Sequence, residues 1–148
     1  MRQLVYALCF KGQARPTSPD GSVLTVTATA SSSTLTSLVN SAGLEASLQP
    51  VAGGEATVSS EVTFTGATSF QEVGTIAFGA GHRLRFSTVG SGYLGPSPDP
   101  VLKHGTVAWR VEGGEGQFAG ASGLITSNVV VGADLAVTDH HFGVLFVP

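Results

Sequence analysis

The sequence is poor in charge and contains one cysteine. Charged residues make up 11% of the 148 residues, and the formal net charge is -3. The seven lysines and arginines are scattered along the chain, so no basic stripe is available for a phosphate backbone, and we predict no nucleic-acid partner. The single cysteine, Cys9, excludes an intramolecular disulfide and a zinc site built from cysteines.

Long apolar runs are also missing. No stretch approaches the roughly 20 apolar residues that span a bilayer, and we predict no membrane partner. The apolar run near the N-terminus is interrupted at Lys11, and no cleavage pattern of small residues follows it, so it does not resemble a secretory signal. These absences predict a soluble cytoplasmic protein.

The abundant residue types favour β-structure. Hydrophobic residues make up 42% of the chain, which also contains 20 glycines. Serine, threonine and valine recur throughout, a composition typical of β-proteins. A chain of 148 residues is long enough for one core and short for two, so we predict a single domain over residues 1–148.

Apolar and polar residues alternate with the two-residue period of strands. In residues 22–30, for example, Leu24, Val26 and Ala28 alternate with three threonines, which predicts one buried and one solvated face. The same kind of pattern, bounded by turn residues, predicts strands over residues 3–11, 22–30, 44–51, 55–65, 70–79, 82–89, 101–111, 122–131 and 135–147.

Two stretches break the alternation. Between Ser33 and Gly43, leucine, valine and alanine recur at helical spacing, which predicts a short helix, either a lid over a ligand site or an ordinary connection. Residues 90–100 contain three prolines and three glycines. They predict a long irregular loop that covers one mouth of the fold.

Together these elements predict an all-β fold, a closed antiparallel eight-stranded barrel with one short helix at most, because closure removes exposed sheet edges. The interior of such a barrel is either filled by side chains or open around one small ligand. The first and last strands are apolar on both faces, so they need a covering surface outside the barrel. We therefore predict a homo-oligomer, a dimer or a trimer.

A glycine-rich corner follows the strand over residues 101–111. Its sequence, GGEGQFAGASG at residues 113–123, resembles the GGxGxFxGAxG corner shared by the allene oxide cyclase and dirigent families. The resemblance extends over residues 81–128 and includes the pair Gly81-His82. It implies a small closed β-barrel with an internal ligand cavity, similar in architecture to the lipocalins.

The same resemblance has consequences for the chemistry. Cyclases of that family use a carboxylate on the first strand, and the pair Val5-Tyr6 aligns that strand with this one. The matching inward positions are Ala7 and Cys9, neither of which is acidic, so allene oxide cyclisation itself is not expected. His104 aligns with a tyrosine that lines the family's cavity.

Candidate site residues are polar groups on otherwise apolar strand faces, because no motif for a nucleophile, a metal or a phosphate is present. An apolar wall raises the pKa of a carboxyl group and lowers that of a histidine, which suits both to proton transfer near neutral pH. The candidates for proton transfer are Glu72, His82, His104 and His140, and those for ligand contact are Tyr6, Cys9, Phe86 and Asn128.

Each candidate also has a structural explanation. A lone histidine on an apolar face often packs or ends a strand, and Glu72 lies near a strand start, where water can solvate it. The adjacent His140 and His141 point to opposite faces and cannot share a metal ion. We predict no metal and no cofactor, although the unknown strand register leaves open a site formed by Glu72 and histidines.

We predict a cofactor-independent cyclase, isomerase or lyase that acts on a small hydrophobic oxygenated metabolite inside the barrel. Two alternatives remain: a non-catalytic carrier of such a ligand, and a filled barrel with a purely structural role. The size of the interior side chains separates the filled barrel from the other two. Titratable groups that converge on a cavity separate the enzyme from the carrier.

Overall fold

A computed structural model describes residues 1–148 and consists almost entirely of antiparallel strands. There is no α-helix, and one 3-10 turn, η1 (Gly116–Phe118), interrupts the strands. No helix is long and apolar enough to cross a bilayer. The strands are β1 (Arg2–Pro16), β2 (Val23–Asn40), β3 (Gly43–Phe64), β4 (Ser69–Phe78), β5 (Arg83–Thr88), β6 (Gly92–Pro96), β7 (Leu102–Glu115), β8 (Ser122–Gly132) and β9 (Ala136–Val147).

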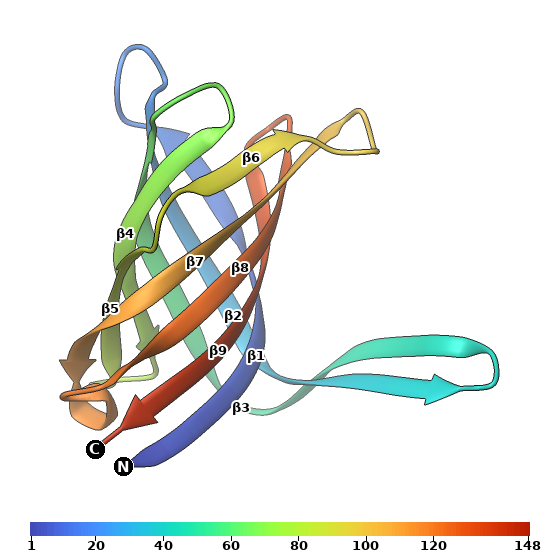
Figure 1. The fold of residues 1–148 in the computed structure, drawn as a ribbon, viewed down its shortest axis with the longest axis vertical. Helices are drawn as coiled ribbons and strands as arrows, with labels where there is room; N and C mark the ends of the chain where they lie inside the picture. Colours follow the sequence, from blue (N-terminus) through green and yellow to red (C-terminus); the bar gives the residue numbers. More distant parts are fainter.

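The strands form one sheet that closes in a ring (Figure 1). Hydrogen-bonded neighbours follow the order β3-β2-β1-β9-β8-β7-β5-β4-β6, and the pairing of β3 with β4 returns the sheet to its start. The short strand β6 pairs with both β4 and β7. Both chain termini lie at the same end of the ring.

The alternation in the sequence is confirmed in the strands. On β2, Ala28 is buried while Thr27 and Thr29 are exposed, and on β3 Val58 and Val62 are buried. One set of side chains therefore points into the ring and the other set points outward, as the pleat of a strand requires.

The interior is packed solid in the part of the ring nearer the termini. Trp109 is completely buried, stacks on Phe86 with ring centroids 4.1 Å apart, and meets the edge of His141 at 4.9 Å. Phe10, Ile125 and other apolar side chains complete this core. Trp109 thus has a packing role and does not line a ligand cavity.

The outer surface of the first and last strands carries an apolar stripe. Val5 on β1, Phe142 and Phe146 on β9, and Leu124 on β8 are all exposed. These residues account for the apolar character of both faces that the sequence displays. The homo-oligomer remains a prediction.

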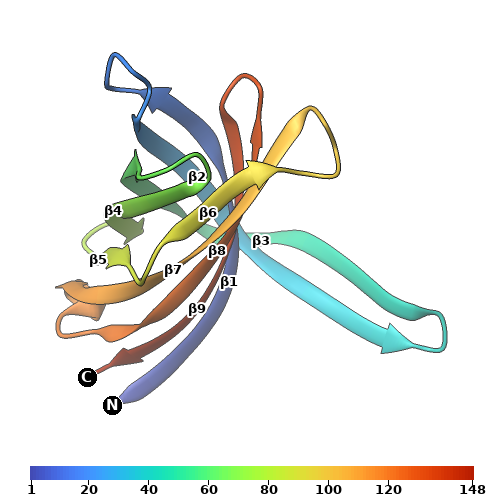
Figure 2. The same cartoon turned by 45° about the horizontal axis from the view of Figure 1, so that its top comes forward.

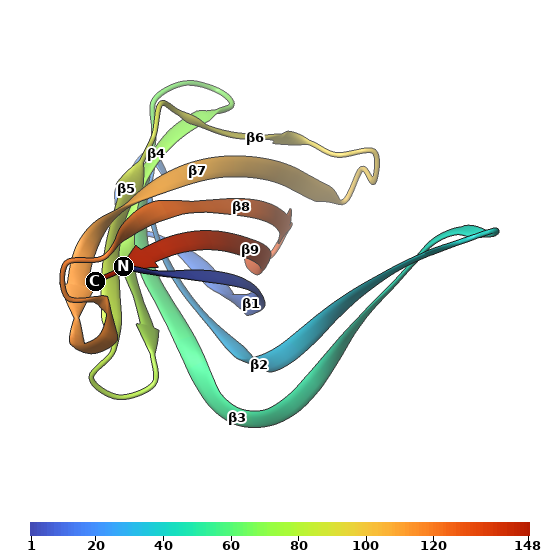
Figure 3. The ribbon, with the colours of Figure 1, turned by 60° about the horizontal axis from the view of Figure 1, so that its bottom comes forward.

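The helix predicted between Ser33 and Gly43 is wrong. The ends of β2 and β3 instead form a hairpin, with Leu35 opposite Leu48 and Val39 opposite Leu44. Figures 1, 2 and 3 show this hairpin extending away from all the other strands. The helical spacing is a local pattern, but the structure of residues 33–40 is determined by their cross-strand pairs with residues 43–50.

The loop predicted over residues 90–100 is only partly irregular. Residues Gly92–Pro96 form β6, which runs along β7 from Tyr93 opposite Thr106 to Pro96 opposite Lys103. Proline is tolerated here because it ends a short edge strand, where no further ladder donor is needed.

Gly12 allows β1 and β2 to approach closely. A Cβ at this position would collide with the carbonyl oxygen of Thr27 and with the Cα of Ala28. We expect Gly12→Ala to lower the free energy of unfolding by about 1–3 kcal/mol, the usual cost of overpacking. Urea denaturation measures this loss, and Gly54→Ala is the control because nothing lies within 4 Å of its added Cβ. Equal stability of the two variants would contradict the prediction.

Candidate functional site

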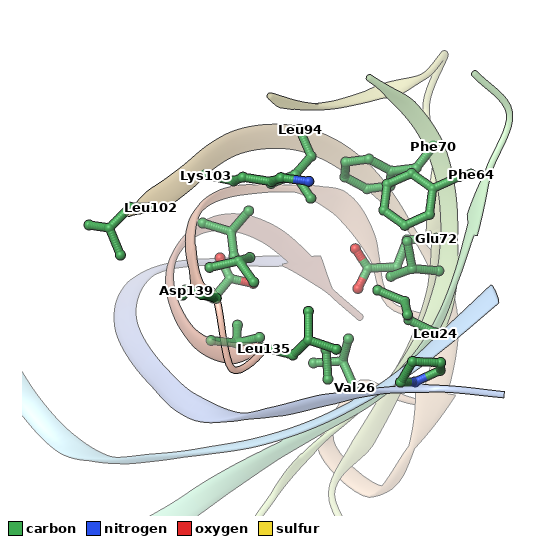
Figure 4. A pocket seen from close by; sticks show the side chains of 18 of the residues that line it. Leu24, Val26, Phe64, Phe70, Glu72, Leu94, Leu102, Lys103, Leu135 and Asp139 are labelled. Atoms are coloured by element: carbon green, nitrogen blue, oxygen red, sulfur yellow. The ribbon is translucent and has the colours of Figure 1, made fainter. Parts of the chain in front are cut away.

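A cavity of about 710 Å³ opens at the end of the ring opposite the termini. Its walls come from eight strands, all except β5, and from the connections β1–β2, β6–β7 and β8–β9. The lining is mostly apolar, with side chains such as Leu24, Val26, Phe64, Phe70 and Leu94 (Figure 4). This volume lies within the range of small-molecule sites.

Glu72 is the first of two carboxyl groups in this cavity. It lies on the inner face of β4, is buried, and accepts a hydrogen bond at Oε2 from Ser60 Oγ at 2.6 Å. Its backbone is held by Thr88, which accepts from the Glu72 N–H at 2.7 Å and donates to its carbonyl oxygen at 2.8 Å. Its second oxygen, Oε1, has no partner within the chain and is free for a ligand.

The surroundings of Glu72 keep its carboxyl group protonated. Burial raises the pKa of Glu72 to about 8, the hydrogen bond from Ser60 opposes this rise, and the charge of Asp139 adds to it. An apolar environment disfavours the charged form because it replaces water around a carboxylate. At neutral pH Glu72 is therefore a proton donor.

Asp139, on the inner face of β9, is the second carboxyl group. Ser127 Oγ donates to its Oδ1 at 2.5 Å, and His141 Nε2 lies 2.9 Å from its Oδ2. When Asp139 is a carboxylate, Nε2 carries the proton of this contact. His141 is itself fixed between Phe10, at 4.3 Å between ring centroids, and Trp109.

The two carboxyl groups belong to opposite walls. Three strands separate β4 from β9 in either direction around the ring. Figure 4 shows Glu72 and Asp139 extending into the same cavity from facing sides. Lys103, near the start of β7, also lines the cavity and is exposed. A ligand between them would meet a protonated acid on one side and a hydrogen-bonded carboxyl group on the other.

Of the four residues predicted for proton transfer, Glu72 alone lines this cavity. The solvated position considered for it is wrong, because the side chain points inward and is buried. His82, His104 and His140 are all exposed. For His104 and His140 the expectation that their strand faces line the interior is therefore wrong. His82 shares the interior face of Leu84 and Phe86 but lies exposed before β5 begins. None of these histidines joins Glu72 in a metal site.

The exposed histidines have other surroundings. His82 precedes β5, and its Nδ1 accepts a hydrogen bond from the backbone N–H of Gln117 at 3.0 Å. His104 lies on the outer face of β7, between Gly95 of β6 and Val130 of β8. His140 is on the outer face of β9, opposite Cys9 and opposite the exposed Asn128.

The residues predicted for ligand contact lie outside the cavity. Tyr6 and Phe86 point into the ring but belong to its packed part, where Tyr6 meets Phe78 edge-on at 5.5 Å between centroids. Burial raises the pKa of Tyr6 above its ordinary value. Cys9 lies on the outer face of β1, because its neighbours Leu8 and Phe10 pack in the core.

The alignment of Ala7 and Cys9 with inward positions is wrong for the same reason. The inward residues of this segment are Leu4, Tyr6, Leu8 and Phe10. None of them is acidic either, so the first strand supplies no carboxylate to the interior.

Sequence reasoning missed Asp139, His141 and Ser127. The signal was present, because the period of two places His141 on the same face as Asp139, Gly143 and Leu145. The opposite face contains Phe142 and Phe146, which look like interior residues, but both are exposed. The face that contains Asp139, His141, Gly143 and Leu145 is the interior face, although it is the less apolar of the two.

Comparisons with protein-family models, curated proteins and solved structures find no match for this chain. The resemblance to allene oxide cyclases and dirigent proteins stays a prediction. The function has to be argued from the cavity and its two carboxyl groups.

Proposed function

We propose that the ring is a closed eight-stranded barrel and that its cavity binds a small apolar molecule carrying an oxygen. In this proposal the protein is a cofactor-independent isomerase, cyclase or lyase. The observation that supports it is the pair of facing carboxyl groups, Glu72 and Asp139, in one mostly apolar cavity. Environments that separate the protonation of two such groups create an acid and a base in one site.

The proposed reaction begins with proton transfer at the ligand's oxygen. Glu72 Oε1 donates its proton to a carbonyl oxygen, and Asp139 removes a proton from the neighbouring carbon. The electron pair of that C–H bond forms a C=C bond, and the carbonyl π pair becomes the new O–H bond, which gives an enol. Return of the Asp139 proton to a different carbon, with return of the oxygen proton to Glu72, yields an isomer and restores the protein.

Each supporting residue has a role in this scheme. Ser60 holds Glu72 with Oε1 toward the cavity, and His141 with Ser127 fixes the carboxyl group of Asp139. Fixed groups around a confined ligand lower the barrier because little orientation remains to be lost in the transition state.

The lining also indicates the class of ligand. An apolar body would contact leucine, valine and phenylalanine side chains, and its oxygen would lie at Glu72. Lys103 is the only cationic residue in the lining. An anionic group at the outer end of the ligand would therefore be accommodated near the mouth.

Binding is tested with anilinonaphthalene sulfonate, an apolar anion whose fluorescence rises in dry sites. We expect it to bind, and we expect Val129→Trp, which fills the cavity, to weaken binding at least about tenfold, or about 1.4 kcal/mol. Asn128→Trp is the matched control, because the adjacent residue on the same strand is exposed on the outer face. Equal effects of the two substitutions would argue against the cavity as the binding site.

Catalysis is tested by the conversion of a β,γ-unsaturated ketone to its conjugated isomer, followed by ultraviolet absorbance. We expect Glu72→Gln and Asp139→Asn each to slow turnover by about 10²-fold or more, and Glu61→Gln, on the exposed face of β3, to leave it unchanged. The rate should fall as the pH rises through about 8, where Glu72 loses its proton. Turnover that survives both carboxyl substitutions would contradict the catalytic proposal.

The second candidate is a non-catalytic carrier, and the predominantly apolar lining favours it. Binding that is lost in Val129→Trp, without turnover of any enolisable ligand, is the result expected of a carrier. The cavity of about 710 Å³ argues against a completely filled barrel, the third possibility raised by the sequence.

A further inference from the structure

The hairpin that leaves the ring, residues 32–54, is an arm without a partner. It consists of the end of β2 and the beginning of β3, and Figure 3 shows it distant from the other strands. Large apolar side chains on it are open to solvent, with Val39 79% and Leu44 70% exposed. An isolated two-stranded hairpin is only marginally stable in water, so this arm needs a covering surface.

The arm has one apolar face and one polar face. Leu35 is paired with Leu48 and Val39 with Leu44, and alternation puts these four side chains on the same face. The opposite face contains threonine, serine and glutamine, together with Leu38 opposite Glu45, the one charged residue of the arm. The apolar face therefore carries no charge that would oppose its burial.

The departure of the arm leaves one edge of β1 open. β1 pairs with β9 from Arg2 to Gln13, but it pairs with β2 only from Lys11 to Pro16. Residues 2–10 consequently present backbone N–H and C=O groups without a strand partner on one side, an arrangement that favours the addition of another strand.

A groove of about 600 Å³ runs beside this open edge. Its walls include Leu4, Tyr6 and Leu8 of β1, Phe78 and Phe118 on the other side, and the base of the chain's own arm at residues 32–35 and Val51. The groove contains no charged residue, so its chemistry matches the apolar face of the arm. The open edge, residues 2–10, is as long as the β2 part of the arm, residues 32–40.

The arm of the same chain has the wrong face for this groove. The observed register pairs Lys11 with Thr29, and its continuation would place Thr34 opposite Tyr6 and Leu35 opposite Val5. The polar face would then point into the core, since Tyr6 points inward and Val5 outward. A shift by one residue would exchange the faces, and an arm from another chain is free to adopt that shift.

We propose that the arm of one copy occupies the groove of a second copy, and the reverse, in a twofold dimer formed by exchange of hairpins. Its apolar face would cover Tyr6, Leu8 and Phe118, and its backbone would pair along the open edge of β1. A hairpin of this length covers about 250 Å² of the groove and buries about the same area of its own surface, so two exchanged arms bury about 1,000 Å² in total. That area reaches the roughly 1,000 Å² that a biological interface is expected to bury.

The test is light scattering at micromolar concentration on the full chain. We expect a dimer for the native sequence, a monomer for the double variant Val39→Glu with Leu44→Glu, and a dimer for Thr36→Glu, whose charge lies on the polar face opposite Ser47. All three side chains are exposed in the single chain, so these changes should leave the fold intact, which circular dichroism checks.

Hydrogen exchange locates the contact. We expect amides of residues 2–10 that lack a ladder partner to exchange at least about tenfold more slowly in the dimer than in the monomeric double variant. A native monomer, a dimer that survives the double variant, or dissociation by Thr36→Glu as well would each overturn the exchange of hairpins. A dimer without protection at this edge would do the same.

Discussion

Glu72→Gln should abolish most of the fall in stability that the native protein shows as the pH rises from about 4.5 to about 8. The first value is the ordinary pKa of a glutamate and the second is the pKa of Glu72 in the folded protein. Between them the folded state binds more protons than the unfolded state, so the free energy of unfolding falls with rising pH. The slope is about 1.4 kcal/mol per pH unit at most, and the total loss is up to about 5 kcal/mol.

Chemical denaturation at a series of pH values measures this effect. The difference between the native and Glu72→Gln profiles isolates the titration of this one group, because all other groups are shared. Glu61→Gln, at an exposed position on β3, should give a profile parallel to that of the native protein. If the Glu72→Gln profile is parallel as well, Glu72 ionises in the folded state at an ordinary pH and cannot be the acid of the proposed site.

Trp109→Ala should cost about 3–5 kcal/mol of the free energy of unfolding. Trp109 is completely buried and stacks on Phe86, and no neighbouring loop can move in to fill the space, since strands surround it on all sides. The same change removes the edge contact with His141, which fixes Asp139. Loss of stability and loss of site geometry should therefore occur together.

Urea denaturation with Trp109→Phe as the control tests this prediction. Phenylalanine keeps a ring against Phe86 and should recover more than half of the loss. A cost below about 1 kcal/mol for Trp109→Ala would mean that the packed part of the ring tolerates a large cavity, contrary to what its complete burial implies.

The site also shows how far strand patterns lead toward function. Glu72 was predicted from a carboxyl group on the face shared with Ile76 and Phe78, and that face is the interior. His104 and His140 met the same criterion and lie on outer faces, while His82 shares the interior face of Leu84 and Phe86 but lies exposed before β5 begins. On β9 the criterion fails because the outer face, with Phe142 and Phe146, is apolar as well, so hydrophobicity no longer distinguishes inside from outside.

The sequence by itself determined the class of fold and the approximate positions of most strands, because the two-residue period and the turn residues are local properties. It missed the arm of β2 and β3 and the short strand β6. It also determined that Asp139 and His141 share a face. Only the tertiary structure decided which face is interior, which carboxyl groups meet across the cavity, and where β2 and β3 leave the ring. Those outcomes depend on register between strands distant in the chain, and a shift of one residue in register exchanges every inward side chain for an outward one.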